Sequence, residues 1–176
     1  MSSKYPILKP IREFRPIRTL IGIMIIFASL QFTLLQGCAG PSDPMSFNPP
    51  ISEIAAAVSA AGGYGGMVPL DGKMLERLFN VSSNSIDSFE AQIANVNIKA
   101  EEFAVIKLKS VSDAESVSEK LEMRISSQSE SFKDYLPQEY YLISKHILKT
   151  KGMYVFYAVA QDPSAAEKAF DSFFED

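Results

Sequence analysis

A chain of 176 residues has room for one domain of ordinary size and a leader segment. Its apolar fraction of 47% and charged fraction of 22% are typical of a protein that folds and exclude a fully disordered chain. Residues 1–37 carry a net charge of +4 (five basic and one acidic side chain), whereas residues 38–176 carry −8 (12 basic and 20 acidic), which argues against nucleic-acid binding by the part after the leader.

The first 37 residues have the three parts of an export signal. Basic side chains come first, an apolar run from Leu20 to Leu35 follows, and the run ends in the tetrapeptide Leu35-Gln36-Gly37-Cys38. This tetrapeptide resembles the lipobox of bacterial prolipoproteins, which has an apolar residue at −3 and a small residue at −1 before the cysteine. The resemblance implies that a signal peptidase cuts between Gly37 and Cys38, and that the Cys38 sulfur carries a diacylglyceryl group with fatty acids such as palmitate.

Two other interpretations of this leader stay open, an uncut signal anchor and ordinary secretion. The apolar run is about 16 residues long and contains Ser29, Gln31 and Thr33, whereas a spanning helix needs about 20 apolar residues. Cys38 is the only cysteine of the chain, so no internal disulfide can form. Because two acyl chains anchor a protein stably, we expect an extracytoplasmic protein held on the cell membrane by lipid.

Residues 38–50 are predicted to be a tether. Prolines at 41, 44, 49 and 50 disfavour a helix and favour an extended chain. The sequence therefore predicts three parts: a signal peptide (1–37), a lipidated tether (38–50) and a single domain (51–176).

The domain pattern predicts an α+β fold. Two helices are expected to start near Ile51 and Asp71, with the glycine-rich loop 62–66 between them, and strands follow near 89–98 and 103–109. A long helix is expected from Asp113 and stops at Pro137, and a short segment 138–144 comes after it. The chain then forms a hairpin of strands 146–150 and 153–160 around Lys151-Gly152 and a last helix from Asp162. An antiparallel sheet of about four strands, with helices packed mainly on one face, buries the apolar stripes most simply.

Several short sequence segments of this domain resemble those of a known family. They are Leu70-Asp71, Glu101-Glu102-Phe103-Ala104-Val105, Phe132-Lys133-Asp134-Tyr135-Leu136-Pro137-Gln138-Glu139-Tyr140 and Lys151-Gly152-Met153-Tyr154-Val155. Through them the region from about Val68 to Phe174 resembles the bacterial family described as domain of unknown function 4358. A lipobox leader is common in that family, which agrees with the interpretation of Cys38. The family has no assigned activity, so the resemblance implies no catalytic or binding residue.

No motif predicts a catalytic, cofactor or metal site. One histidine and one cysteine cannot form a Cys/His zinc site. The segment from Gly66 to Lys73 lacks the spacing of a phosphate-binding loop and is interpreted as a helix-entry turn. His146 is expected to be a satisfied edge or core histidine, although a Ser144–His146 nucleophile pair is conceivable.

The adjacent carboxylates Glu101 and Glu102 are interpreted as solvated turn residues. Neighbours on an extended chain point to opposite sides, so a pair facing one substrate would need a special turn.

An aromatic group around Pro137 is the candidate interaction patch, formed by Phe132, Tyr135, Tyr140 and Tyr141. Tyrosines offer a large rigid area with a polar tip and suit recognition surfaces. The alternative is that the same side chains pack as a lid over one end of the sheet.

These features together favour a non-enzymatic module at the cell envelope, which binds a partner protein, an envelope polymer or a small ligand. The alternative is an envelope enzyme with a carboxylate, tyrosine or lysine cleft assembled by the fold. A deep cleft with converging ionisable groups would favour the enzyme, and a flat aromatic patch the binding module. A passive spacer is the third possibility.

Overall fold

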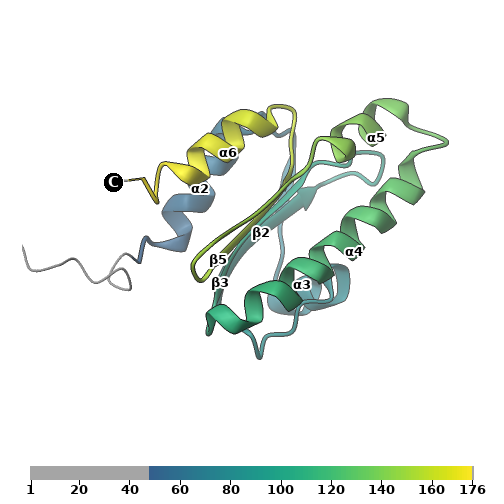
Figure 1. Ribbon diagram of the computed structural model, residues 1–176. Coiled ribbons are helices and arrows are strands. Elements are labelled where there is room, and N and C mark those ends of the chain that lie inside the picture. The colour runs from purple at the N-terminus through teal and green to yellow at the C-terminus, as the bar shows by residue number, and fades with distance from the viewer. Residues whose placement is uncertain (1–47, 176) are drawn as a thin grey trace, which may run out of the picture. The chain divides into compact units, whose positions relative to one another are not determined.

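The computed structural model describes residues 48–175 (Figure 1). The predicted signal peptide, Gly37 and Cys38 at the predicted cleavage and lipidation site, and most of the predicted tether lie outside the described residues. The elements in chain order are α2 (Ile51–Ala61), β1 (Met67–Pro69), α3 (Gly72–Phe79), β2 (Ile86–Ala94), β3 (Glu102–Leu108), a short 3-10 helix η2 (Val111–Asp113), α4 (Ala114–Phe132), α5 (Pro137–Ser144), β4 (Ile147–Lys151), β5 (Tyr154–Val159) and α6 (Pro163–Asp171).

Five antiparallel strands form one sheet in the order β1-β2-β3-β5-β4. β3 and β5 lie at its centre, with Val105 opposite Phe156. The β4–β5 hairpin turns at Gly152, whose φ of 57° is left-handed and favours glycine, as expected for Lys151-Gly152.

The sheet has a hydrophobic core on each face. On one face Ala104, Ile106 and Tyr157 pack with side chains of α3 and α4, and on the other Phe103 and Phe156 pack with side chains of α2 and α6. Figure 1 shows α2 and α6 on one side of the sheet and α3, α4 and α5 on the other. The domain therefore has three layers.

The α+β class and the antiparallel sheet are confirmed, and two details differ from expectation. The sheet has five strands because three residues, Met67–Pro69, pair with the end of β2. Helices cover both faces because the central strands are apolar at nearly every position: all of β5 and all of β3 except Lys107 are buried. A strand buried on both faces has no alternation that would reveal a second layer.

Helix ends follow the sequence signals. Asp71 caps α3 by accepting from the backbone N of Met74 at 2.8 Å, and Asp162 caps α6 through the N of Ala165 at 2.9 Å. The long helix ends at Phe132, and Pro137 starts α5 at its first turn, where proline is favoured.

The described chain enters the domain at the end of the sheet where β5 begins. The Tyr154 hydroxyl donates to the Asn48 Oδ1 at 2.7 Å and to the Pro49 carbonyl at 2.9 Å. β5 then runs to Val159, which lies opposite Glu102 at the other end of the sheet. Among residues 48–175, no helix is long and apolar enough to cross a bilayer.

Candidate binding site

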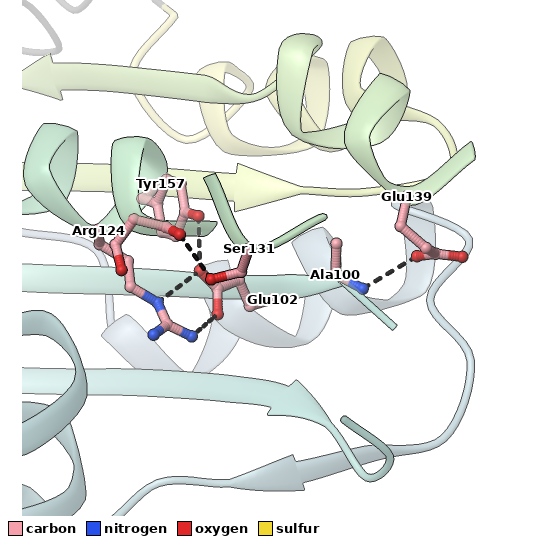
Figure 2. Close-up of polar contacts among 7 residues, drawn as sticks. Ala100, Glu102, Arg124, Ser131, Glu139 and Tyr157 are labelled. Atoms are coloured by element: carbon pink, nitrogen blue, oxygen red, sulfur yellow. Dashed lines mark hydrogen bonds and ion pairs between the residues drawn. The ribbon is translucent and has the colours of Figure 1, made fainter. Parts of the chain in front are cut away.

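A buried ion pair lies at the end of the sheet away from the chain entry. Glu102, the first residue of β3, accepts from Arg124 of α4 through two bonds, Nε–Oε1 at 3.1 Å and Nη2–Oε2 at 2.7 Å (Figure 2). The Tyr157 hydroxyl of β5 donates to the same Oε1 at 2.6 Å. Both oxygens of this carboxylate are thus occupied by donors of the protein.

The electrostatics of this cluster keep its donors protonated. Burial would lower the pKa of Arg124, but the hydrogen bonds and negative charge of Glu102 outweigh burial and raise it. Burial, followed by the charge and hydrogen bond of Glu102, raises the pKa of Tyr157 well above its usual value. The Arg124 guanidinium also lies over the Phe79 ring, 5.3 Å from its centroid. The cluster is therefore a fixed polar element within the core.

A pocket of about 210 Å³ opens beside this ion pair. Its polar lining includes Asn97, Lys99, Glu102, Arg124 and Gln128, and its apolar lining is Leu78, Ile93, Ala94, Val96 and Phe132. With its amide oxygen turned toward Arg124, Gln128 accepts from Nη1 at 2.8 Å. The pocket is smaller than the roughly 300–1,000 Å³ of most small-molecule sites.

The β2–β3 connection that forms the rim of this pocket is held by α5. The buried Glu139 accepts from the backbone N of Ala100 at 2.9 Å (Figure 2) and from Lys99 Nζ at 2.7 Å. The hydrogen bond to Glu139 raises the pKa of Lys99. Since Glu139 lies one residue before Tyr140, this contact also places the rim next to the aromatic segment.

Glu101 faces the other side of the sheet. Its Oε1 accepts from the Gln161 side chain at 2.6 Å. The hydroxyl of Tyr64, in the glycine-rich loop 62–66, is buried there and has no hydrogen-bond partner among residues 48–175. Burial, and after it the charge of Glu101, raises the pKa of Tyr64 above its usual range. A Cβ at Gly62 would clash with the Tyr64 ring, so glycine is needed where this ring packs.

The interpretation of Glu101 and Glu102 as solvated turn residues was wrong. Their side chains lie within the fold and the two residues are only 5% and 3% exposed. Their partners come from α4, β5 and the segment after β5, which no local pattern reveals. The expectation that the two adjacent carboxylates point to opposite sides is confirmed by those partners.

The structure divides the candidate aromatic patch. Phe132 is buried in the core between α4 and the sheet, so the lid interpretation holds for this ring. Tyr135, Tyr140 and Tyr141 are on the surface, 84%, 41% and 59% exposed. Lys145 lies over the Tyr141 ring at 5.6 Å. The three tyrosines thus form an exposed group on and beside the α4–α5 turn, whereas Phe132 lines the pocket.

The structure also shows where three other features singled out in the sequence lie. His146 is half-buried, with Nδ1 2.8 Å from the Ile143 carbonyl oxygen, as expected for a satisfied histidine. The Ser144 hydroxyl donates to the Tyr141 carbonyl at 2.7 Å, so it is not paired with His146. The segment from Gly66 to Lys73 forms β1 and the capped entry to α3, which confirms the helix-entry turn.

Sequence reasoning missed Arg124, Tyr157 and Glu139. Arg124 lies three residues after the buried Leu121 and directly before the buried Ile125, so a basic residue beside the apolar positions of the long helix was the available signal. Over residues 48–175, no group of three or more histidine, cysteine, aspartate or glutamate side chains could hold a metal ion.

Comparison with known proteins identifies a family. Neither the curated proteins nor the solved structures contain a match to this chain. The family model described as Domain of unknown function (DUF4358) matches residues 60–160, from the end of α2 to the end of β5, which confirms the resemblance noted in the sequence. The match covers more than half of the chain, and the protein belongs to this family.

Proposed function

We propose that this protein is a lipid-anchored, extracytoplasmic module of the cell envelope that binds a partner protein or ligand. Support for the anchor comes from the sequence, where Cys38 directly follows an apolar run and Gly37. The lipid holds the domain at the membrane, and residues 38–50 let it reach partners away from the bilayer surface.

The observation that carries the binding role is the exposed group of Tyr135, Tyr140 and Tyr141 around the α4–α5 turn. Tyrosine contributes large contact area at low entropic cost and is enriched in protein interfaces. The contact between Glu139 and the backbone of Ala100 places this group at the end of the sheet opposite the chain entry at Asn48.

An envelope enzyme is the competing function, and the pocket does bring ionisable groups together. Its Glu102 carboxylate, however, already accepts three hydrogen bonds from Arg124 and Tyr157. Three of the roughly four lone-pair positions of a carboxylate are thus taken, and bonds from a cation and a hydroxyl make this carboxylate a weak general base. The engaged carboxylate and the small volume of the pocket support binding rather than catalysis.

Mass spectrometry of the intact protein from the membrane fraction of a bacterial host tests the anchor. We expect a chain that begins at Cys38 and carries the added mass of a diacylglyceryl group. A chain that keeps residues before Cys38 and has a free thiol would overturn the lipoprotein and make the leader a signal anchor.

Site-specific photocrosslinking in the membrane-bound full chain tests the binding surface. We expect a photoreactive phenylalanine at Tyr135 or Tyr141 to capture a defined envelope partner. The same group at Val111, an exposed position just before α4, is the control and should capture none of it. Equal capture from all three positions, or none from the tyrosine positions, would contradict a binding role for this surface.

A further inference from the structure

Half of β2 has no neighbouring strand on its outer side. β1 pairs only with Gln92, Ile93 and Ala94, and the last contact is the Leu70 N donating to the Ala91 carbonyl at 2.9 Å. The chain then turns away into α3. Within residues 48–175, no strand continues along 86–90 of β2.

The hydrogen-bond alternation identifies the open backbone groups. Ala94 N donates toward β3, whereas Asn95 N donates toward β1 and the Ala91 carbonyl accepts from the β1 side. In an antiparallel sheet successive residues bond to opposite sides, so Phe89 directs its N–H and C=O to the β1 side. In the described chain no backbone group meets them there, and the edge can accept another strand.

A second observation points to an occupant at the same place. A pocket of about 350 Å³ lies along this half of β2, and Leu75, Val81, Ile86 and Phe89 form its apolar lining. Gly72, the first residue of α3, lines it too. This volume falls within the range of ligand pockets and admits one large apolar side chain.

We propose that this edge binds an extended peptide segment of a partner protein. The segment continues the line of β1, pairs with the backbone of Phe89, and inserts one apolar side chain into the pocket. Main-chain bonds supply affinity in this binding mode, and a pocket for alternate side chains supplies specificity. The register shift between Ile86 and Ser88 limits the pairing to the part of β2 after Asp87.

Charge indicates that the segment is neutral to basic. Asp87 is exposed and Glu90 half-buried on this half-strand, and residues 38–176 carry −8. Among the residues that the structure describes, Asp87 has one ion-pair partner, Lys107, at 3.1 Å. A second copy paired edge to edge would bring the same carboxylates together, whereas lysine side chains on a peptide would be attracted to them.

The probe is the acetylated and amidated peptide Lys-Thr-Lys-Leu-Lys-Thr-Lys, added to the isotope-labelled full chain in detergent. As an extended strand it places leucine on the pocket side and lysines on the opposite side. We expect saturable binding with NMR shifts centred on the amides of Phe89 and Ala91. Two further versions of the peptide carry N-methyl groups on the backbone nitrogens of either the odd or the even positions. A methyl group removes the N–H donor, and the two sets of N–H groups lie on opposite edges of an extended peptide, so only the version methylated on the edge that pairs with β2 should lose binding.

Gly72→Leu and Gly72→Ala are the matched variants. A Cβ at Gly72 meets no atom within 4 Å, so both variants should fold, which circular dichroism checks. We expect leucine to fill the pocket and weaken peptide binding about tenfold or more, and alanine to leave it within about twofold. Asp87→Asn should weaken binding about threefold in low salt and less in high salt.

Three results would overturn the proposal. They are absence of peptide binding, equal binding to the two Gly72 variants, and a free chain that is already a dimer with this edge protected from hydrogen exchange. The last result would identify a second copy as the occupant.

Discussion

Glu101 and Glu102 are adjacent in the chain and equally buried, but they face opposite sides of the sheet and have different partners. Glu102 is bound by an arginine and a tyrosine, whereas Glu101 accepts a hydrogen bond from a neutral glutamine. A buried carboxylate stabilises a fold only when a cation and hydrogen bonds compensate its desolvation. The Glu102 side should therefore be the stable part of this end of the domain, and the Glu101 side, under the glycine-rich loop, the part that opens first.

Removal of the cation should have the largest effect. Arg124→Met leaves Glu102 buried without a cation, and we expect the free energy of unfolding to fall by about 3–5 kcal/mol. Urea unfolding followed by circular dichroism measures this loss. Arg124→Lys, which keeps a charge but not the paired geometry, should lose less. A loss below about 1 kcal/mol for the methionine variant would show that the ion pair does not stabilise the fold.

Neutral replacements of the two carboxylates should separate them. Glu102→Gln leaves the buried arginine without its counterion, and we expect a loss of about 2–3 kcal/mol of unfolding free energy. Glu101→Gln keeps a side chain that can accept from Gln161 and removes an uncompensated charge, so its loss should stay below about 1 kcal/mol. Each variant is the control for the other in the same urea titration. Equal losses of unfolding free energy would show that the two carboxylates do not differ in their contribution to stability.

Alkaline titration should reveal the two buried tyrosines. Because the folded protein raises the pKa of both Tyr64 and Tyr157, their contribution to stability is present below the unfolded tyrosine pKa, near 10, and is lost as pH rises above it. Each group should lower the unfolding free energy by at most about 1.4 kcal/mol per pH unit.

Single variants assign this alkaline loss. Tyr64→Phe should remove the part of the pH dependence that Tyr64 contributes. It should break no hydrogen bond, because the Tyr64 hydroxyl makes none within the described part of the chain. Glu101→Gln should lower the pKa of Tyr64 but leave it above the usual value, since burial remains the larger cause. Stability profiles between pH 8 and pH 11 measure both effects; an unchanged slope in Tyr64→Phe would contradict the assignment.

The sequence predicted those parts of the domain that depend on local signals. Asp71 and Asp162 marked helix starts, Gly152 marked a turn, and Pro137 marked a helix boundary, because each acts through its own backbone or the next turn. The burial of Glu102 could not be predicted, since its partners lie 22 and 55 residues away. The second helical layer was missed for the related reason that β3 and β5 are apolar on both sides.

The exposed tyrosines could be found in the sequence, but their separation from Phe132 could not. Phe132 ends α4 facing the sheet, whereas Tyr135 lies in the turn beyond the helix. The two rings were grouped around Pro137 because the sequence pattern does not show at which residue before Pro137 the helix ends. The position of that end depends on Pro137, which begins α5 with a change of direction.

Replacement of an exposed tyrosine should have the smallest effect on stability, in contrast to replacement of the buried residues. Tyr135 is 84% exposed, and its replacement in Tyr135→Ser should change the unfolding free energy by no more than about 0.5 kcal/mol. If this surface binds the partner, the same variant should nevertheless lose crosslinking from Tyr141. Phe132→Ala is the contrasting change: it should cost about 3–5 kcal/mol, because it opens a cavity in the core. A Tyr135→Ser protein that is fully stable and still captures the partner from Tyr141 as well as the unchanged chain would show that exposure alone does not make Tyr135 part of the binding surface.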